Sequence, residues 1–265
     1  MGYLRRYTLI VSSVAIFATA GLWPGYAQAA EWPAAAFEAA TAQQALKALY
    51  GTTEVAPSDA ILLKVQSYTQ NGALVPIVVS TTLPNVQSIA ILVDKNPAPL
   101  IAALEPVNVR GYLAVHIKMA QSSDVRVVVK SGDKLYGKSQ PITVTVGGCG
   151  GEIDPPAPSK DRTMKLRTVA HGGSGVELRM LITHPMESGQ RTDKNTKQKI
   201  PPHFVQRVVL EHKGKPIATT LMAGGVAENP LLGFHLKDAK NGDPVKISWN
   251  DSRGESGALE GRVSL

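Results

Sequence analysis

The sequence contains a single cysteine, Cys149, among 265 residues, and only 5% of its side chains are aromatic. One cysteine excludes an internal disulfide framework, and the absence of a Cys-x-x-Cys-His motif excludes covalently attached c-type haem. After residue 29 no apolar run approaches the ~20 residues that span a bilayer. No run of Lys and Arg is long enough to indicate a nucleic-acid-binding tract.

The first 29 residues have the pattern of an export signal. Arg5-Arg6 precede an uncharged, apolar run over residues 7–23, and Ala27-Gln28-Ala29 is a small-residue cleavage pattern. A transmembrane anchor is the alternative, but glycine and proline interrupt the run just before the cleavage pattern. We therefore expect a cleaved signal peptide over residues 1–29, with the Sec and twin-arginine routes both open.

Without that segment, which holds two arginines and no acids, the net charge falls from +7 to +5. A modest positive charge favours anionic small molecules or acidic protein partners, although most such charges serve only to solvate a surface.

The first segment after the cleavage pattern predicts a helix from Trp32-Pro33 to about Tyr50. Apolar residues recur there at helical spacing, and Gly51 is suited to end the helix; the repeating residues are Ala42, Ala45, Leu46 and Leu49.

The rest of the chain is typical of short strands joined by turns. We expect twelve strands, over residues 61–68, 74–80, 88–93, 107–119, 125–130, 141–146, 164–169, 175–182, 204–211, 216–222, 244–249 and 258–263. Hairpin turns are predicted at His212–Lys215 and Asp251–Gly254. Strands at this spacing without alternating helices favour an all-β fold with two tandem β-sandwiches.

Residues 147–162 interrupt the strand pattern and form the clearest boundary. Four glycines surround the cysteine, and a proline-rich stretch follows at Asp154–Ser159. Glycine makes a linker flexible, whereas proline makes it extended and stiff. We therefore expect a first domain over residues 30–151, a linker over 152–162 and a second domain over 163–265.

The boundary also holds the most informative motif, the glycine arm Gly147-Gly148-Cys149-Gly150-Gly151. Four glycines give this backbone great conformational freedom and leave no side chains to bury the cysteine. We therefore expect a flexible arm that presents its thiol outside the domain. The alternative is that the glycines only begin the linker. An exposed thiol is a liability in an oxidising compartment, so its position favours use.

The chemistry of this thiol depends on its pKa, because the thiolate is the reactive form. No general base lies next to Cys149 in the sequence, and Glu152 would raise the thiol pKa. Activation by a partner enzyme is therefore more natural than catalysis by this chain alone.

The six histidines do not predict a metal site, because none forms a HxxH or HxxxH pair; they are His116, His171, His184, His203, His212 and His235. Ligands assembled from both domains remain open. His184-Pro185-Met186 could offer copper ligands, but a turn at the interface between the domains explains it better. A Cys149 hydrolase would need a histidine brought near by folding. The motif around Ser174, with His171 in its first position, is not a Gly-x-Ser-x-Gly elbow, and we interpret it as a hairpin turn.

At this point the motifs resemble a known family. Asn71–Ile77, Asp94–Pro99 and Gly147–Gly151 resemble SoxY. The remaining motifs, in order along the second domain, resemble SoxZ: His184–Gly189, Ile200–Phe204, Glu228-Asn229-Pro230 with Phe234, and Trp249-Asn250-Asp251.

The resemblance implies immunoglobulin-like sandwiches and a periplasmic carrier of bacterial sulfur oxidation. Cys149 would hold a thiosulfate-derived group covalently, for example as a persulfide, while partner enzymes load, oxidise and release it. The chain itself would not be an enzyme, and it would need no metal or other cofactor. A homodimer linked through Cys149 is a further expectation.

Two departures from the family pattern bear on the partners. The subunits are usually separate chains, and the SoxY arm is usually a free C-terminus, whereas here the arm continues into a second domain. Fused versions resemble a SoxYZ-like subgroup associated with quinoprotein (PQQ) alcohol dehydrogenases. The alternative function is therefore an accessory or binding protein of such a dehydrogenase and cytochrome system.

Overall fold

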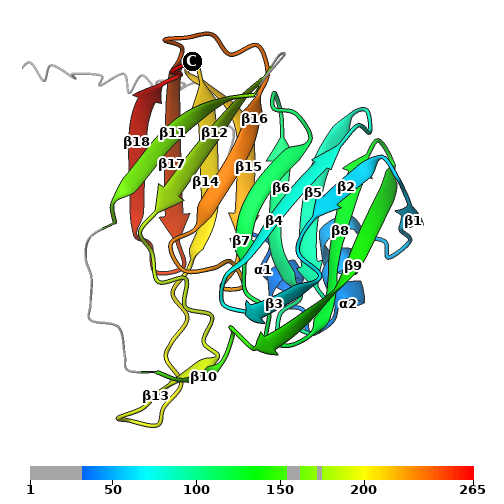
Figure 1. Ribbon diagram of the computed structural model, residues 1–265, viewed down its shortest axis with the longest axis vertical. Coiled ribbons are helices and arrows are strands. Elements are labelled where there is room, and N and C mark those ends of the chain that lie inside the picture. Colours follow the sequence, from blue (N-terminus) through cyan, green and yellow to red (C-terminus); the bar gives the residue numbers. More distant parts are fainter. Residues whose placement is uncertain (1–31, 154–161, 172–174) are drawn as a thin grey trace, which may run out of the picture. The chain divides into compact units, whose positions relative to one another are not determined.

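The computed structural model (Figure 1) describes residues 32–153, 162–171 and 175–265, and Trp32–Leu265 form one compact unit. The expected signal peptide, most of the proline-rich linker and the turn around Ser174 lie outside the described residues. Below, the first half means residues 32–153 and the second half means residues 162–265. No helix in the described ranges is long and apolar enough to cross a bilayer.

The fold begins with two short helices instead of the single predicted one, α1 (Ala34–Phe37) and α2 (Ala42–Tyr50). Thr41 separates them because its extended backbone and its side chain cap α2, with the Thr41 hydroxyl accepting from the Gln44 N–H at 3.2 Å. Gly51 ends α2 in the left-handed conformation, as predicted.

Two large β-sheets form the body of the protein and confirm the all-β fold of tandem sandwiches. The larger sheet has the order β1 (Ala56–Pro57), β9 (Lys134–Val146), β8 (Ser123–Ser131), β5 (Val86–Val93), β6 (Leu100–Pro106), β15 (Lys215–Met222), β14 (Val205–His212), β17 (Pro244–Asp251) and β18 (Ser256–Arg262), with β3 (Tyr68–Asn71) paired to β9. The smaller sheet has the order β11 (Met164–His171), β12 (Gly175–Ile182), β16 (Leu231–Leu236), β7 (Tyr112–Ile117), β4 (Val75–Thr81) and β2 (Ile61–Lys64).

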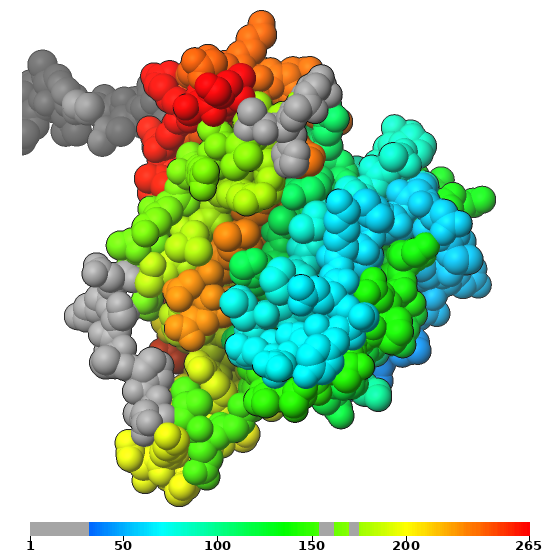
Figure 2. Space-filling model, viewed as in Figure 1, coloured from blue at the N-terminus to red at the C-terminus, as the bar shows by residue number. Residues whose placement is uncertain are grey.

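Both sheets continue from one half into the other. In the larger sheet β6 pairs antiparallel with β15, and in the smaller sheet β16 pairs antiparallel with β7. Figure 2 shows the two halves packed side by side, the first in blue to green and the second in yellow-green to red. The halves are therefore joined by backbone hydrogen bonds as well as by side-chain packing.

One hydrophobic core runs between the two sheets through both halves, and includes Ile77 and Val127 from the first and Leu178 and Phe234 from the second. The helices add a second layer of packing on the outer face of the larger sheet, where Phe37 and Leu46 cover β5 and β6. Strands covered on both faces have no wet side, which explains the continuous burial of β6.

Most predicted strands match the structure, including β12 and both predicted hairpin turns. Of the strands with six or more residues, β6 and β16 were missed, and the predicted strand over 107–119 is shortened to β7. The predicted strand over 61–68 is interrupted, so that β2 and β3 lie in different sheets. A small two-stranded sheet, β10 (Gly151–Ile153) with β13 (Arg191–Asp193), completes the fold.

Candidate functional site

Cys149 lies between the end of β9 and the start of β10, and its side chain is buried, with 5% of the residue exposed. Backbone hydrogen bonds fix the approach to it. The Gly148 N–H donates to the Met119 carbonyl at 2.8 Å, and the Gly72 N–H donates to the Val146 carbonyl at 2.8 Å. The sequence predicts a thiol presented outside the domain, and the structure differs because neighbouring segments of both halves cover it.

The glycines of the arm serve different purposes. A Cβ on Gly147 would lie 2.1 Å from the Ala120 carbonyl oxygen, and one on Gly148 would lie 2.1 Å from the Ala73 backbone nitrogen. Gly150 has only one atom within 4 Å of such a Cβ, at 3.8 Å, and Gly151 has open space but a φ of +104°. The first two glycines therefore permit close backbone packing, where the sequence suggested only conformational freedom.

The chain beyond the arm is also held in place. Residues Gly151–Ile153 pair in parallel with Arg191–Asp193, and the Lys197 ammonium contacts the Glu152 carboxylate at 2.9 Å. The arm is thus bounded by β9 on one side and by β10 on the other, so in this conformation it is a tethered loop.

Lys118, directly after β7, is the charged group that acts on Cys149. It is only 6% exposed, and its ammonium donates to the carbonyls of Met186 and Gly224, both in the second half. Burial lowers the pKa of Lys118 to about 8, and the Cys149 thiolate is one of the charges that act against this decrease. An ammonium has three donors, and two are used by these carbonyls.

The Cys149 thiol itself is in its unreactive form at neutral pH. Burial raises the pKa of Cys149 to about 11, although the positive charge of Lys118 acts in the opposite direction. Because only the thiolate attacks disulfides or electrophiles, the buried thiol is protected in this conformation. Any reaction of this thiol requires either movement of the arm or a change in its surroundings.

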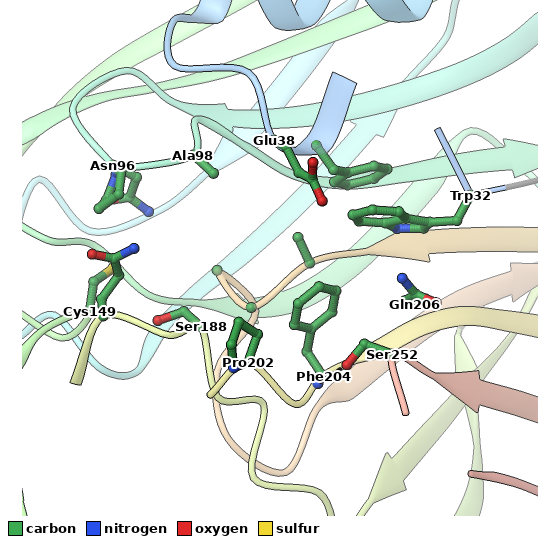
Figure 3. Close-up of a pocket in the computed structure, with 16 residues that line it drawn as sticks. Trp32, Glu38, Asn96, Ala98, Cys149, Ser188, Pro202, Phe204, Gln206 and Ser252 are labelled. Carbon is green, nitrogen blue, oxygen red and sulfur yellow. Dashed lines mark hydrogen bonds between the residues drawn. The ribbon is translucent and has the colours of Figure 1, made fainter. Parts of the chain in front are cut away.

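Cys149 lines a cavity of about 400 Å³ at the junction of the two halves. Figure 3 shows Cys149 at one end of this cavity and Trp32 at the other, with Phe204 and Pro202 along one side. The Trp32 ring stacks on Phe37 at a centroid distance of 5.1 Å and lies 5.8 Å from the Phe204 ring. We call this space the Cys149 cavity; its walls come from the N-terminal segment, the β5–β6 loop and the second half.

A second buried polar group lies in the second half, where His184, His203 and Asp251 converge. The Asp251 Oδ2 atom is 3.2 Å from His184 Nε2 and 2.8 Å from His203 Nε2. The Asp251 Oδ1 atom accepts from the backbone N–H groups of Arg253 and Glu255, both at 2.8 Å. Burial by itself would raise the pKa of Asp251, but these hydrogen bonds lower it below its usual value.

This histidine cluster brings together the separate motifs of the second half. His184 belongs to the motif 184–189, His203 to 200–204 and Asp251 to 249–251. Asn229, from the motif 228–230, accepts from the His184 backbone N–H at 3.0 Å through its side chain. The sequence reasoning missed this cluster because the residues are far apart along the chain, and it considered only ligands drawn from both halves, whereas these three residues all lie in the second half.

The three side chains are close enough to hold a metal ion, with candidate ligand atoms within 4.8 Å of one another. The tautomer of His184 argues against it. Its Nδ1 accepts from the Met186 backbone N–H at 3.1 Å, so the proton resides on Nε2 and points to Asp251. A metal-binding histidine usually donates from its second nitrogen, which this one cannot do. The cluster is therefore best described as a hydrogen-bonded support.

The same hydrogen bonds bear on the hydrolase alternative. Both nitrogens of His184 are engaged, and burial lowers the pKa of His184 to about 4. It therefore has no free nitrogen to act as a base for Cys149. His184 instead positions the loop that follows it: Met186 is fully buried and accepts from Lys118 across the junction. The predicted placement of His184-Pro185-Met186 at the interface is confirmed.

Comparisons with known proteins match both halves. The family model "Sulfur oxidation protein SoxY" matches residues 46–149, and "Sulphur oxidation protein SoxZ" matches residues 164–260. No curated protein matches the chain.

Among solved structures, the sulfur carrier protein SoxY from Chlorobium limicola f thiosulfatophilum is 30% identical, with a TM-score of 0.38 over 43% of this chain and 100% of that chain. A beta-glucuronidase from Parabacteroides merdae is 9% identical, with a TM-score of 0.25 over 78% of this chain and 24% of that one. Because both TM-scores are low, the family assignment depends on the two family models.

Proposed function

Because the chain belongs to the SoxY and SoxZ families of sulfur oxidation proteins, joined in one polypeptide, we propose that it is a periplasmic carrier that holds a sulfur-containing group covalently on Cys149. One observation carries the proposal. The only cysteine of the chain is the last residue of the SoxY match, and it faces a cavity whose walls come from both halves.

The surroundings of Cys149 support the role of a carrier acted on by other proteins. Its thiol is protonated at neutral pH, because burial raises the pKa of Cys149 to about 11. A partner that draws the arm out of its cover would return the thiol to water and lower that pKa toward its usual range. We propose that sulfur-oxidation enzymes load and release the sulfur-linked group in this exposed state.

The buried state has a complementary use. A sulfur–sulfur bond is open to attack by any free thiol, so an exposed adduct would be lost to small thiols. Return of the arm to the junction would place the adduct beside Lys118 and away from solvent. Burial thus protects the cargo between partners, and exposure permits its transfer.

Intact-mass measurement of the protein purified from its native host tests this function. During oxidation of sulfur compounds, the wild-type chain should carry added sulfur-containing mass that a reducing agent removes. Cys149→Ser should carry none while keeping its fold, since serine is nearly the same size as cysteine. A wild-type chain without adducts under these conditions would contradict the proposed carrier function.

A second candidate function is an accessory protein of a periplasmic quinoprotein alcohol dehydrogenase. The observation that favours it is the tethering of the arm: β10 pairs with β13, so Cys149 is not on a free tail. Under this alternative the sandwich surfaces matter and the thiol does not. Cys149→Ser would then leave dehydrogenase-dependent growth on alcohols intact, whereas a carrier would lose its function in the same assay.

A further inference from the structure

The charge of the Cys149 cavity indicates which cargo it accepts. Within the described part of the chain, its lining contains one charged residue, the carboxylate of Glu38, and no Lys, Arg or His. The other polar groups are amides and hydroxyls, from Asn96, Gln190, Gln206, Ser188 and Ser252. A sulfur oxyanion placed here would meet no cation in the lining, and it would meet the solvent-exposed, screened negative charge of Glu38.

The cations near the cavity do not reverse this conclusion. Lys118 is buried and donates to two carbonyls, and Arg191 is held by Glu187 through a contact of 2.6 Å from Nε to the carboxylate. Neither residue lines the cavity. Lys118 can therefore balance charge on the Cys149 sulfur, but the group attached to that sulfur extends into a space without cations.

The apolar end of the cavity suits a carbon-containing group. The rings of Trp32 and Phe204 form its wall opposite Cys149 (Figure 3), and the Trp32 ring stacks on Phe37. The Trp32 indole N–H already donates to the Met222 carbonyl at 2.9 Å, so its ring face is what remains for a ligand. Aromatic walls favour apolar or aromatic groups, through burial of apolar surface and ring stacking.

Size leads to the same conclusion. The cavity measures about 400 Å³, whereas one water molecule takes about 30 Å³ in the liquid. A sulfonate group of four atoms would leave most of this space unfilled. A group the size of an aromatic ring or a branched alkyl chain would fill much more of it, within the range of pockets that bind small organic ligands.

We propose that the Cys149 cavity accepts the uncharged organic part of a thiol cargo, carried as a mixed disulfide on Cys149. The proposal deepens the carrier function and depends on Cys149 being the attachment site. In the loading step the Cys149 thiolate attacks one sulfur of a disulfide R–S–S–R. A bond forms between Sγ and that sulfur, the original S–S bond breaks, and the leaving R–S⁻ takes up the proton that Cys149 lost. No external oxidant is needed.

Two disulfide reagents test the proposal on the full-length mature chain. Dithiodipyridine is aromatic and uncharged, and dithiobis(nitrobenzoate) is aromatic and dianionic. Each rate with folded protein is divided by the rate with the same chain unfolded in urea, which removes the intrinsic reactivity of the reagent. We expect this ratio to be at least about tenfold higher for the neutral reagent than for the dianionic one. A tenfold difference in rate corresponds to about 1.4 kcal/mol.

Matched variants locate the selectivity. Glu38→Gln should raise the ratio for the dianionic reagent about threefold, which is half of the tenfold difference on a logarithmic scale. The ratio for the neutral reagent should stay unchanged. Glu54→Gln, at an exposed glutamate outside the cavity, should change neither. Phe204→Leu should lower the ratio for the neutral reagent and spare the dianionic one.

Equal ratios for the two reagents, or no reaction of either with the folded chain, would overturn the proposal. So would equal effects of Glu38→Gln and Glu54→Gln. These outcomes are distinct from failure of the carrier function itself. If native protein carries a sulfur oxyanion on Cys149 and the ratios are equal, the carrier function stands and the organic cargo falls. If native protein carries no adduct, both fall.

Discussion

The two buried polar regions of this protein differ in how completely hydrogen bonds satisfy them. In the histidine cluster, Asp251 accepts four hydrogen bonds, and both nitrogens of His184 have partners. At Cys149, the thiol lies beside Lys118 and faces a cavity that can hold another group. The first arrangement is closed and serves the fold, and the second leaves room for chemistry.

The second half contains most of the family motifs, but they surround the histidine cluster and do not include the cysteine. Four family motifs of the second half meet at the histidine cluster, and together they support one wall of the Cys149 cavity. Pro202 and Ser252 line that wall and directly adjoin His203 and Asp251 in the sequence, and Ser188, also in the wall, belongs to the same motif as His184. The second half therefore contributes a rigid surface, and the first half contributes the reactive group.

The largest expected effect tests the structural role of the histidine cluster, through the free energy of unfolding. Asp251→Asn replaces a carboxylate oxygen with an NH2 group that cannot accept from the buried histidines, and each buried group left without its partner typically costs about 1–3 kcal/mol of unfolding free energy. Urea denaturation measures it. Asp59→Asn is the matched control, because Asp59 is exposed and pairs only with Lys138, and it should leave the unfolding free energy unchanged. Equal effects of the two variants would remove the structural role of the cluster.

The next effect distinguishes two uses of glycine within the arm. Gly148→Ala would force a Cβ against the Ala73 backbone, at a cost of about 1–3 kcal/mol or an opened arm. Gly150→Ala adds a methyl group whose one neighbour within 4 Å lies at 3.8 Å, and it should be tolerated. Unfolding free energy and the rate of thiol alkylation report both outcomes. If the glycines served only for flexibility, the two variants would behave alike.

A pH dependence of stability follows from His184. Burial lowers the pKa of His184 to about 4 in the folded chain, against 6.5 as its ordinary value. Between these values the unfolded chain binds a proton that the folded chain does not, so stability falls as the pH decreases from 6.5 toward 4. For one proton the slope approaches about 1.4 kcal/mol per pH unit.

Unfolding free energies from urea denaturation at several pH values measure this slope. His116, half-buried, also has a lowered pKa because of burial, so His116→Gln is the control and should leave most of the slope in place. A flat profile in this range, or a slope that His116→Gln abolishes, would show that His184 is not a buried neutral base.

The smallest expected effect concerns the charge beside Cys149. Lys118→Met removes the cation that lowers the pKa of Cys149, so the thiolate fraction at pH 8 should fall by up to about tenfold, one pKa unit. Alkylation rates between pH 7 and 10 measure it, and in the wild type they should rise about tenfold per pH unit below a pKa near 11.

Lys138→Met, at a half-exposed lysine paired with Asp59, is the control for this charge effect and should not change the rates. An alkylation rate that does not respond to Lys118→Met would show that the ammonium supports only the junction through its two carbonyls.

Part of the fold could be predicted because several strands alternate between buried and more exposed residues. In the second half, β14 and β17 alternate in this way and lie close to their predicted limits. The missed strands are those at the junction: β6 is buried along most of its length and contains two alanines, and β16 has Gly233 in its centre. Strands without alternation or with glycine are hard to recognise locally, so the joining of the halves could not be predicted.

The candidate site could be predicted only in part. Cys149 was identifiable because it is a lone cysteine among glycines, but its position depends on contacts of Gly147 and Gly148 with the distant residues Ala120 and Met119, and its cavity depends on the second half. The histidine cluster depends on contacts between residues up to 67 positions apart. Such contacts are set by strand pairing across the fold, and no local spacing records them.

Peptide-level mass spectrometry is the most direct test of whether Cys149 carries a sulfur-linked group. Trypsin should release residues 139–160 as one peptide that contains Cys149 and no other cysteine. In protein taken from cells oxidising sulfur compounds, we expect a substantial share of this peptide to carry a sulfur-linked mass on Cys149, and we expect reduction to remove that mass. A peptide found only as the free thiol under those conditions would contradict the account.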